Sequence, residues 1–343
     1  MQRITNSMMT SKFLSNMKRN LNNMSTLQNQ LASGKEILRT SQNPFAATRN
    51  KQLANQISDN EQYNANIKDT SNWLDTTDTA LAQAGNVMAR IKELMVKAGN
   101  GAYSEDEIAT IKNEVVEKSK ELAQIMNTTF DGAYIFGGTK GTSKPVTVDS
   151  NGNLAYADKN GNGFGNPAIP DVSTGNDKTN AESQLSTSLK TEISQGVVVE
   201  YNKTATDIFE FTDTKLGDNI NVMNEISTLI NNLGKMSDKT GATTDAEKEA
   251  ALNYVNGEGL SKMDSIVQNL LANRAQVGTM QNRMESAMET NEDQNYNMTD
   301  ILSSSEDIDF TEKTMEYAVM QTVYTASLQT SSKVLMNTIM DYI

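Results

Sequence analysis

The chain has 343 residues and a formal net charge of −13, and 37% of its residues are hydrophobic and 6% aromatic. This composition is lean for one large globular core but suits long helices that each bury a narrow stripe. The negative charge argues against nucleic acid binding. The absence of cysteine and histidine excludes disulfides, thiol nucleophiles, histidine acid–base pairs and the usual zinc sites.

The sequence also lacks long apolar runs. The N-terminus has no apolar core of the kind found in cleavable secretory signals, and no run approaches transmembrane length. We therefore expect no membrane insertion. If this protein leaves the cell, we expect export without a cleavable signal peptide.

The first predicted segment, residues 1–43, is a helix whose apolar residues alternate at spacings of three and four. Its stripe consists of Leu14, Met17, Leu21, Met24 and Leu31. The stretch LASGKEILRTSQNPFAA, residues 31–47, then contains a break, because Asn43 is a good N-cap and Pro44 suits the first position of a helix. We predict that one helix ends near Arg39 and that another begins at Pro44.

The second segment, residues 44–138, is predicted to contain the ascending rod helices. Apolar residues recur at helical spacing from Leu53 to Met95. Ser104, with Glu107 three residues later, forms a capping box that predicts the start of a further helix.

The third segment, residues 139–215, is predicted to be a β-rich outer domain. Three of the four prolines lie in it, together with a dense run of glycine and asparagine. The sequences PVTV and NLAYA flank the turn sequence DSNG and predict a β-hairpin, and GVVVEY and DIFEF are further strand candidates.

Helical periodicity returns in residues 216–304, the predicted returning rod helices, and continues in residues 305–343. One face of the last helix is expected to carry Tyr317, Met320, Tyr324, Leu328, Leu335 and Ile339. The predicted fold is mainly α with a β-rich insertion. It is a folded-back rod of long coiled-coil-like helices from both termini, with a small β domain at its tip.

Two acidic stretches are candidates for a metal site or a catalytic site. Residues Asp158 to Gly163 match the first half of an EF-hand calcium loop, but the twelfth position is Ile169, where a bidentate glutamate is needed. The acidic sequence SEDID precedes the last helix, where Asp309 or Thr311 would cap it. We interpret these stretches as a turn and a helix start, and we predict no catalytic site, metal site or cofactor.

The two terminal segments have too few apolar side chains to offset the conformational entropy that is lost when they become ordered. They need further apolar surface, most plausibly that of other copies of the same chain. We therefore predict that both ends are loose in the monomer and fold when subunits assemble, with the apolar stripes as the assembly interface.

Two stretches resemble the terminal motifs of flagellins. The sequence LASGKEI is similar to the N-terminal motif through Ser33 and Gly34, and Pro44 follows. The acidic pair expected before the proline is Gln42-Asn43 here, which keeps the capping ability but loses the charge. Near the other end, NRAQVGTMQNRMES resembles the C-terminal motif through Arg274, Gln281, Asn282 and Arg283.

A third stretch narrows the resemblance within the flagellin superfamily. The sequence FDGAYIFGGTKGTSKP contains Phe136, Gly137 and Gly138 followed by threonine, and this Phe-Gly-Gly-Thr run resembles the hook–filament junction proteins. The modest size of the β-rich insertion also favours a junction protein over a filament flagellin.

The resemblance implies a structural subunit of the bacterial flagellum and not an enzyme. Copies would form a helical ring at the hook–filament junction, with their terminal helices lining the inner tube. The neighbours would be another hook-associated protein and filament flagellin. Family members leave the cell through the flagellar type III apparatus, usually with an export chaperone, which implies an extracellular location.

Two other functions stay open at this point. Filament flagellin shares the expected fold and termini, although the Phe-Gly-Gly-Thr run argues against it. An intracellular coiled-coil scaffold would continue its apolar seams through the middle of the chain, where the β-rich insertion interrupts them.

Overall fold

The computed structural model describes residues 6–101, 103–171, 176–213 and 217–335. Contacts divide the chain into two compact units: a terminal unit, residues 1–61 and 292–343, and a central unit, residues 62–291. The long helices α2 (Pro44–Ala98) and α8 (Glu258–Glu306) contribute residues to both units. The units therefore end inside α2 and α8, and the five-segment division drawn from the sequence stays a prediction.

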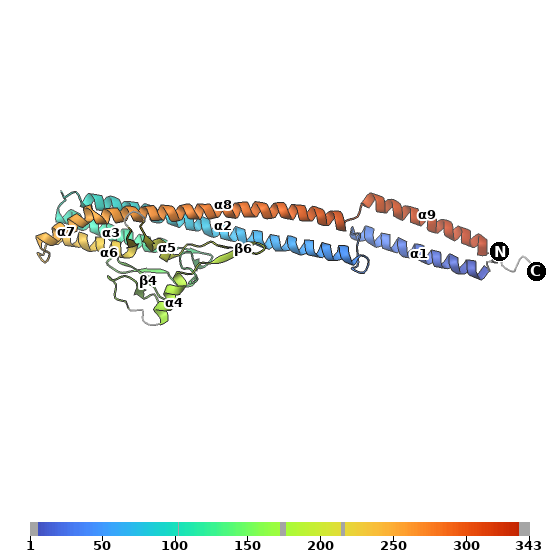
Figure 1. The fold of residues 1–343 in the computed structure, drawn as a ribbon, viewed down its shortest axis with the longest axis horizontal. Helices are drawn as coiled ribbons and strands as arrows, with labels where there is room; N and C mark the ends of the chain where they lie inside the picture. Colours follow the sequence, from blue (N-terminus) through green and yellow to red (C-terminus); the bar gives the residue numbers. More distant parts are fainter. Residues whose placement is uncertain (1–5, 102, 172–175, 214–216, 336–343) are drawn as a thin grey trace, which may run out of the picture. The chain divides into compact units, whose positions relative to one another are not determined.

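In the terminal unit, α1 (Asn6–Ser33) and α9 (Phe310–Leu335) lie side by side (Figure 1). The expected end of the first helix near Arg39 was too late, because Gly34 adopts a positive φ of 73° and closes α1 after Ser33. The expected start at Pro44 is confirmed, and the Oδ1 atom of Asn43 accepts a hydrogen bond from the backbone N–H of Ala46 at 3.2 Å.

The central unit packs its parts of α2 and α8 with α3 (Glu105–Met126), α6 (Val222–Met236) and α7 (Asp245–Asn256) (Figure 1). The predicted capping box at Ser104 is confirmed. No helix was predicted for the residues of α7. Thr244 and Glu247 form a second capping box there, and this four-residue spacing is the signal that was missed.

The insertion contains small antiparallel sheets and two short helices. Its sheets pair β1 (Thr129–Phe130) with β2 (Ala133–Tyr134), β4 (Leu154–Ala157) with both β3 (Val146–Val148) and β5 (Gly163–Phe164), β6 (Lys190–Ser194) with β7 (Val197–Glu200), and β8 (Glu210–Thr212) with β9 (Asn219–Asn221). The helices are α4 (Asn176–Leu185) and α5 (Ala205–Phe209). The expected fold class, mainly α with a small strand-containing insertion, is confirmed.

Two of the strand predictions can be compared directly with this topology. The predicted hairpin is β3–β4, in which Val146 pairs with Tyr156. The strand predicted at DIFEF was wrong for its first half, because Thr204 and Asp207 form a capping box that starts α5. Only the last two residues of that sequence lie in a strand.

The β6–β7 hairpin is attached to both long helices of the central unit. Asn66 of α2 donates a hydrogen bond to the carbonyl of Glu192 at 3.3 Å, and Asn291 of α8 donates one to the carbonyl of Ile193 at 2.8 Å. Asn291 is almost completely buried. These bonds connect α2 to α8 through the hairpin near the limit of the central unit.

The hydrophobic core lies entirely in the central unit. It extends along the chain from Ile67 to Met284 and includes the fully buried Phe136, Phe164 and Phe209. Among the described residues of the terminal unit, Leu27 is the only hydrophobic side chain that is buried to a comparable degree, with 9% of its surface exposed. The two units therefore differ in how far their own packing can stabilise them.

Two adjacent leucines on α8 provide a matched test of this core. Leu270 is 4% exposed and Leu271 is 58% exposed. We expect Leu270→Ala to lower the free energy of unfolding by about 2–5 kcal/mol through lost burial and a cavity. Leu271→Ala should stay within about 0.5 kcal/mol of the parent protein. Urea unfolding followed by the fluorescence of the single tryptophan measures both, and equal losses would contradict the assigned core.

Candidate assembly surface

Helices α1 and α9 meet along a seam of partly buried residues. The seam repeats at spacings of three and four, as in a coiled coil. It consists of Phe13, Met17, Asn20, Met24, Leu27 and Leu31 from α1, and of Lys313, Tyr317, Met320, Tyr324, Ser327 and Ser331 from α9. Six of the residues predicted as assembly interface are therefore partly buried at positions of this seam.

Three of the predicted interface residues lie outside this seam. Leu14, Leu21 and Leu328 are 59%, 41% and 44% exposed. Each comes one residue after a seam position, so the predicted stripe includes residues from two faces of each helix. Its role as an assembly interface stays a prediction. Leu335 ends α9, and Ile339 lies outside the described residues.

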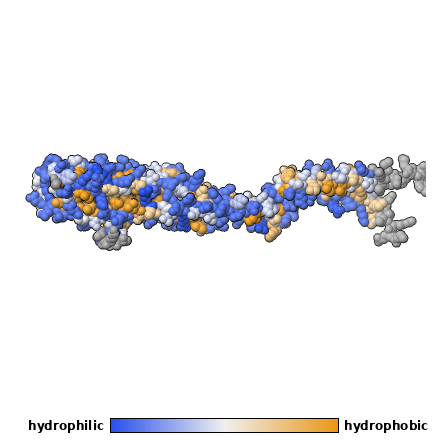
Figure 2. Space-filling view, turned by 90° about the horizontal axis from the view of Figure 1, so that it is seen from above, coloured by the Kyte–Doolittle hydropathy of each residue, from blue (hydrophilic) through white to orange (hydrophobic). Residues whose placement is uncertain are grey.

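The exposed residues of α9 form a second apolar set. Phe310, Met315, Val319, Val323 and Leu328 are all more than two-fifths exposed, and they are distributed around the helix. Val319 also lines a groove between α1 and α9 together with Leu27 and Met320. Apolar side chains are visible on the surface of the terminal helices (Figure 2). A helix that is apolar on several faces is suited to burial on more than one side.

The break at residues 34–43 lies opposite the break between α8 and α9. The backbone N–H of Glu36 donates to the carbonyl of Glu306 at 2.7 Å, and the N–H of Ile308 donates to the carbonyl of Gly34 at 3.0 Å. Lys35 and Glu306 also form an ion pair. An antiparallel β-bridge between Lys35 and Asp307 therefore joins the segment after α1 to the segment before α9. This bridge is why the helical chain breaks here.

The Gln42-Asn43 pair contributes hydrogen bonds at this break. The side-chain oxygen of Gln42 accepts from the backbone N–H groups of Leu38 and Arg39, at 2.9 and 3.2 Å. Asp309 caps α9 from the other side of the break by accepting from the N–H of Thr311 at 2.8 Å. The neutral amide of Asn43 thus caps α2, whereas a carboxylate caps α9.

The Phe-Gly-Gly-Thr run lies in the insertion between β2 and β3 and bonds to two later segments of the insertion. The carbonyl of the fully buried Phe136 accepts from the N–H of Ala205 at 2.9 Å, and Thr139 donates to the carbonyl of Gln184 at 3.0 Å. Gly138 has a φ of 58°, and a Cβ atom there would overlap the same Gln184 carbonyl. Glycine is therefore required by both the backbone conformation and the close approach.

Lys140 follows this run and is buried. Its ammonium donates to the carbonyls of Lys144 at 2.9 Å, Ala157 and Asp158 at 3.1 Å. Burial lowers the pKa of Lys140 to about 8, although the charge of Asp158 raises it. Asp158 itself accepts backbone bonds from Asn160 and Asn162, so it shapes the turn that resembled a calcium loop.

The residues of the C-terminal motif lie on α8 in the central unit. The Arg274 guanidinium donates to both carboxylate oxygens of Asp78 on α2, at 2.7 and 3.1 Å, and Gln281 donates to Asp75 at 2.7 Å. The Asp78 carboxylate raises the pKa of Arg274. Asn282 and Arg283 are exposed, and no side-chain bond to either is found in the described part of the chain. The motif therefore divides into two contacts with α2 and two free side chains.

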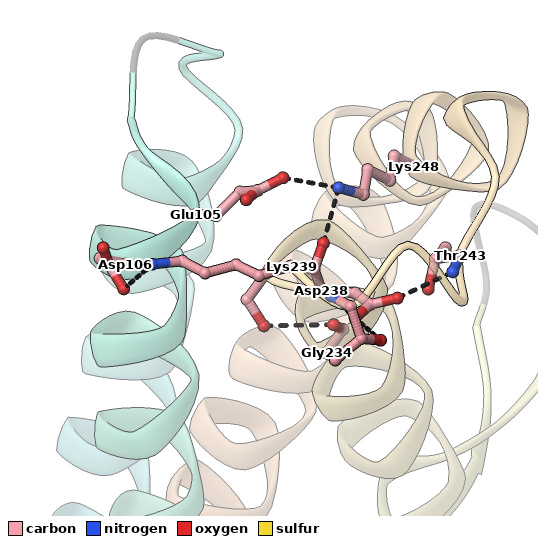
Figure 3. A network of polar contacts seen from close by, with 9 residues as sticks. Glu105, Asp106, Gly234, Asp238, Lys239, Thr243 and Lys248 are labelled. Atoms are coloured by element: carbon pink, nitrogen blue, oxygen red, sulfur yellow. Dashed lines mark hydrogen bonds and ion pairs between the residues drawn. The ribbon is translucent and has the colours of Figure 1, made fainter.

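A polar network joins α3, α6 and α7 (Figure 3). Lys248 donates to Glu105 at 2.6 Å and to the carbonyl of Asp238 at 2.7 Å, and Lys239 pairs with Asp106. Hydrogen bonds from Thr240 and Thr243 hold the pKa of Asp238 well below its usual value. The two ion pairs of this network were not predicted, because their partners are more than a hundred residues apart in the sequence.

Two family profiles match the ends of the chain. The profile of the bacterial flagellin N-terminal helical region matches residues 4–141, and that of the bacterial flagellin C-terminal helical region matches residues 260–342. The chain belongs to the bacterial flagellin superfamily. The seam between α1 and α9 and both flagellin motifs lie within the matched residues. So does the double break, which consists of residues 34–43 and the facing residues 307–309.

Individual relatives of this flagellin-family chain include proteins of more than one type. Flagellar hook-associated protein 3 of Escherichia coli (strain K12) is 22% identical over 301 residues, which cover 87% of this chain and 86% of that protein. The B-type flagellin of Pseudomonas aeruginosa is 30% identical over 133 residues, which cover 37% of this chain and 27% of that protein. All of these names belong to flagellar proteins.

The fold of this flagellin-family chain is also found among solved structures. The crystal structure of the flagellar junction protein FlgL from Legionella pneumophila matches with a TM-score of 0.53 at 17% identity, and the match covers 77% of this chain and 100% of that chain. Among the described residues of this chain, we find no helix that is long and apolar enough to cross a membrane.

The Gly138 contact can be tested against a glycine with the same backbone requirement. Gly161 has a φ of 85° but open space around its Cβ position. Alanine at either position should cost roughly 1–2 kcal/mol for the left-handed backbone. Gly138→Ala should cost more, because the Gln184 carbonyl must also move. Urea unfolding of both variants measures the difference, and a cost at Gly138 no greater than that at Gly161 would contradict the contact.

Lys140 provides a prediction of pH dependence. Its folded-state pKa of about 8 lies below the ordinary value of 10.5, so the folded protein releases this proton first as pH rises. The free energy of unfolding should therefore increase between these two pH values, and Lys140→Met should remove that increase. Nuclear magnetic resonance titration of the lysine side chains measures the pKa directly. A Lys140 pKa at the ordinary value of 10.5 would contradict the burial effect.

Proposed function

We propose that this flagellin-family chain is a structural subunit of the bacterial flagellum that links hook to filament. The observation that favours this function is the extent of the likeness. The alignment with the flagellar hook-associated protein 3 of Escherichia coli covers 86% of that protein, and the match with the flagellar junction protein FlgL of Legionella pneumophila covers 100% of that chain. The Phe-Gly-Gly-Thr run, which anchors the insertion, agrees with the junction assignment.

The proposed mechanism is self-assembly through the terminal helices. The exposed Leu14, Leu21 and Leu328 leave apolar surface on the α1–α9 pair that the chain itself does not cover. Burial of such surface between copies would supply the packing that the terminal unit lacks. Copies would then form a helical ring whose neighbours are another hook-associated protein and filament flagellin.

The proposal assigns no catalytic role to the chain and places it outside the cell as part of the flagellum. A terminal unit with little core of its own would be easy to keep unfolded for passage, and an export chaperone would cover its apolar faces until assembly.

Immunogold electron microscopy on intact source cells tests this function. We expect a single spot of label where the filament meets the hook. Label along the whole filament would make the chain a filament flagellin. Label that appears only after the cells are permeabilised would favour an intracellular scaffold.

Two substitutions at Leu328 test the assembly surface in the same assay. Leu328→Asp places a charge in a surface that becomes buried, so the junction label should disappear. Leu328→Met keeps an apolar side chain of similar volume and should leave the label in place. Melting of the central unit should be unchanged in both variants. Junction label in the Leu328→Asp cells at the parental level would show that this face is not an assembly surface.

A further inference from the structure

A groove with a volume of about 570 Å³ lies on the central unit, between α2, the β1–β2 turn and the β6–β7 hairpin. Its lining includes the aromatic residues Trp73, Phe130 and Tyr201 and the carboxylates Asp69 and Asp131. No lysine or arginine lines it. A groove that combines aromatic faces with uncompensated negative charge is suited to a cation.

The aromatic wall is centred on the only tryptophan of the chain. Trp73 meets the rings of Phe130 and Tyr201 edge to face, at centroid distances of 6.0 and 5.9 Å. Trp73 is 8% exposed, and its buried Nε1 has no acceptor among the described residues. A buried donor without a partner is uncommon in native proteins, but a cation offers this N–H no acceptor, so Trp73 contributes its ring and not its Nε1 atom to the groove.

The two carboxylates of the groove are exposed and lack a cationic partner within the described residues. Several carboxylates of the central unit pair with a lysine or arginine of another helix, as in the Arg274–Asp78 contact. Asp69 and Asp131 have no such partner among the described residues. Their charge is therefore available to a group from outside the subunit.

We propose that this groove binds the guanidinium of Arg283 from a neighbouring copy of the chain. Guanidinium is planar, stacks on aromatic rings and bonds to carboxylates through paired N–H groups, so it fits this lining better than an ammonium. Of the described arginines in the central unit, Arg90 and Arg274 are paired within the subunit, whereas Arg283 is exposed and unpaired.

The surroundings of Arg283 leave it free for such a contact. Its neighbours three and four residues away on α8 are Thr279, Met280, Ser286 and Ala287, none of which is charged. The groove and Arg283 are different surface patches, so a contact between them is heterologous: one face of a copy meets a different face of the next. Helical and ring assemblies require interfaces of this kind. The inference rests on the proposed function, because it assumes that copies stand side by side.

Disulfide trapping tests this contact, because the native chain contains no cysteine. Asp131→Cys and Arg283→Cys chains are produced together in cells that lack the parent chain, and their flagella are isolated and oxidised. We expect a cross-linked dimer on a non-reducing gel. The matched control combines Asp131→Cys with Lys144→Cys, another exposed and unpaired cation, and should give none. Incorporation of both chains without a cross-link, or equal cross-linking in the control, would overturn the proposal.

A measurement on the unassembled parent protein separates this inference from the proposed function and does not depend on incorporation. Trp73 fluorescence is titrated with N-acetyl-arginine amide and with the uncharged N-acetyl-citrulline amide. We expect a saturable change with the arginine probe that is about tenfold weaker with citrulline and in the Asp69→Asn/Asp131→Asn double variant. Equal responses to both probes would overturn the proposal, whether or not the chain is found at the hook–filament junction.

Discussion

The limit on how much apolar surface two helices can bury between them determines much of this structure. Helices α1 and α9 contact each other along a single seam, and polar Asn20 and Lys313 occupy positions within it. Only Leu27 is well buried there. The central unit overcomes the same limit by adding α3, α6 and α7 to α2 and α8, which surrounds a shared core. The terminal unit lacks such additional layers, and this explains why its remaining apolar side chains face outward.

Backbone hydrogen bonds at the double break hold α1 and α9 together where the packing along their seam is weak. The bonds between Glu36 and Glu306 and between Gly34 and Ile308 join chain segments that are about 270 residues apart in the sequence. Backbone bonds of this kind depend little on side-chain packing. They hold the bases of α1 and α9 together, which reduces the conformational freedom that an incoming subunit would have to restrict. A pair of helices joined in this way is suited to adding copies without a large core.

The sequence predicted the features that depend on neighbouring residues. Asn43 with Pro44 and Ser104 with Glu107 gave correct helix starts, because a cap side chain accepts from a backbone N–H at most three residues away. The same three-residue spacing marks the start of α5, at Thr204 and Asp207, and the start of α7, at Thr244 and Glu247. The prediction of faces was less reliable, because a shift of one residue moves Leu14 from the seam occupied by Phe13 to the exposed side.

Contacts between distant residues could not be predicted from one sequence. Nothing near Arg274 indicates that Asp78 is its partner, and nothing near Lys140 indicates that three carbonyls surround its ammonium. The groove beside Trp73 has the same origin, since α2, the β1–β2 turn and the β6–β7 hairpin contribute to it. Spacing rules identify elements, whereas these sites depend on which elements meet.

The two surfaces through which copies are proposed to meet differ in chemistry, and this difference has a physical consequence. The leucines of the terminal helices contribute apolar burial, which does not weaken as salt concentration rises. The carboxylates beside Trp73 contribute a charge contact at an exposed site, which salt screens over about 8–10 Å at ordinary ionic strength. Apolar burial therefore supplies the affinity of assembly, while the charge contact selects which side of one copy faces the next. A subunit that must join itself in one orientation only needs both kinds of contact, because apolar stripes alone permit more than one register.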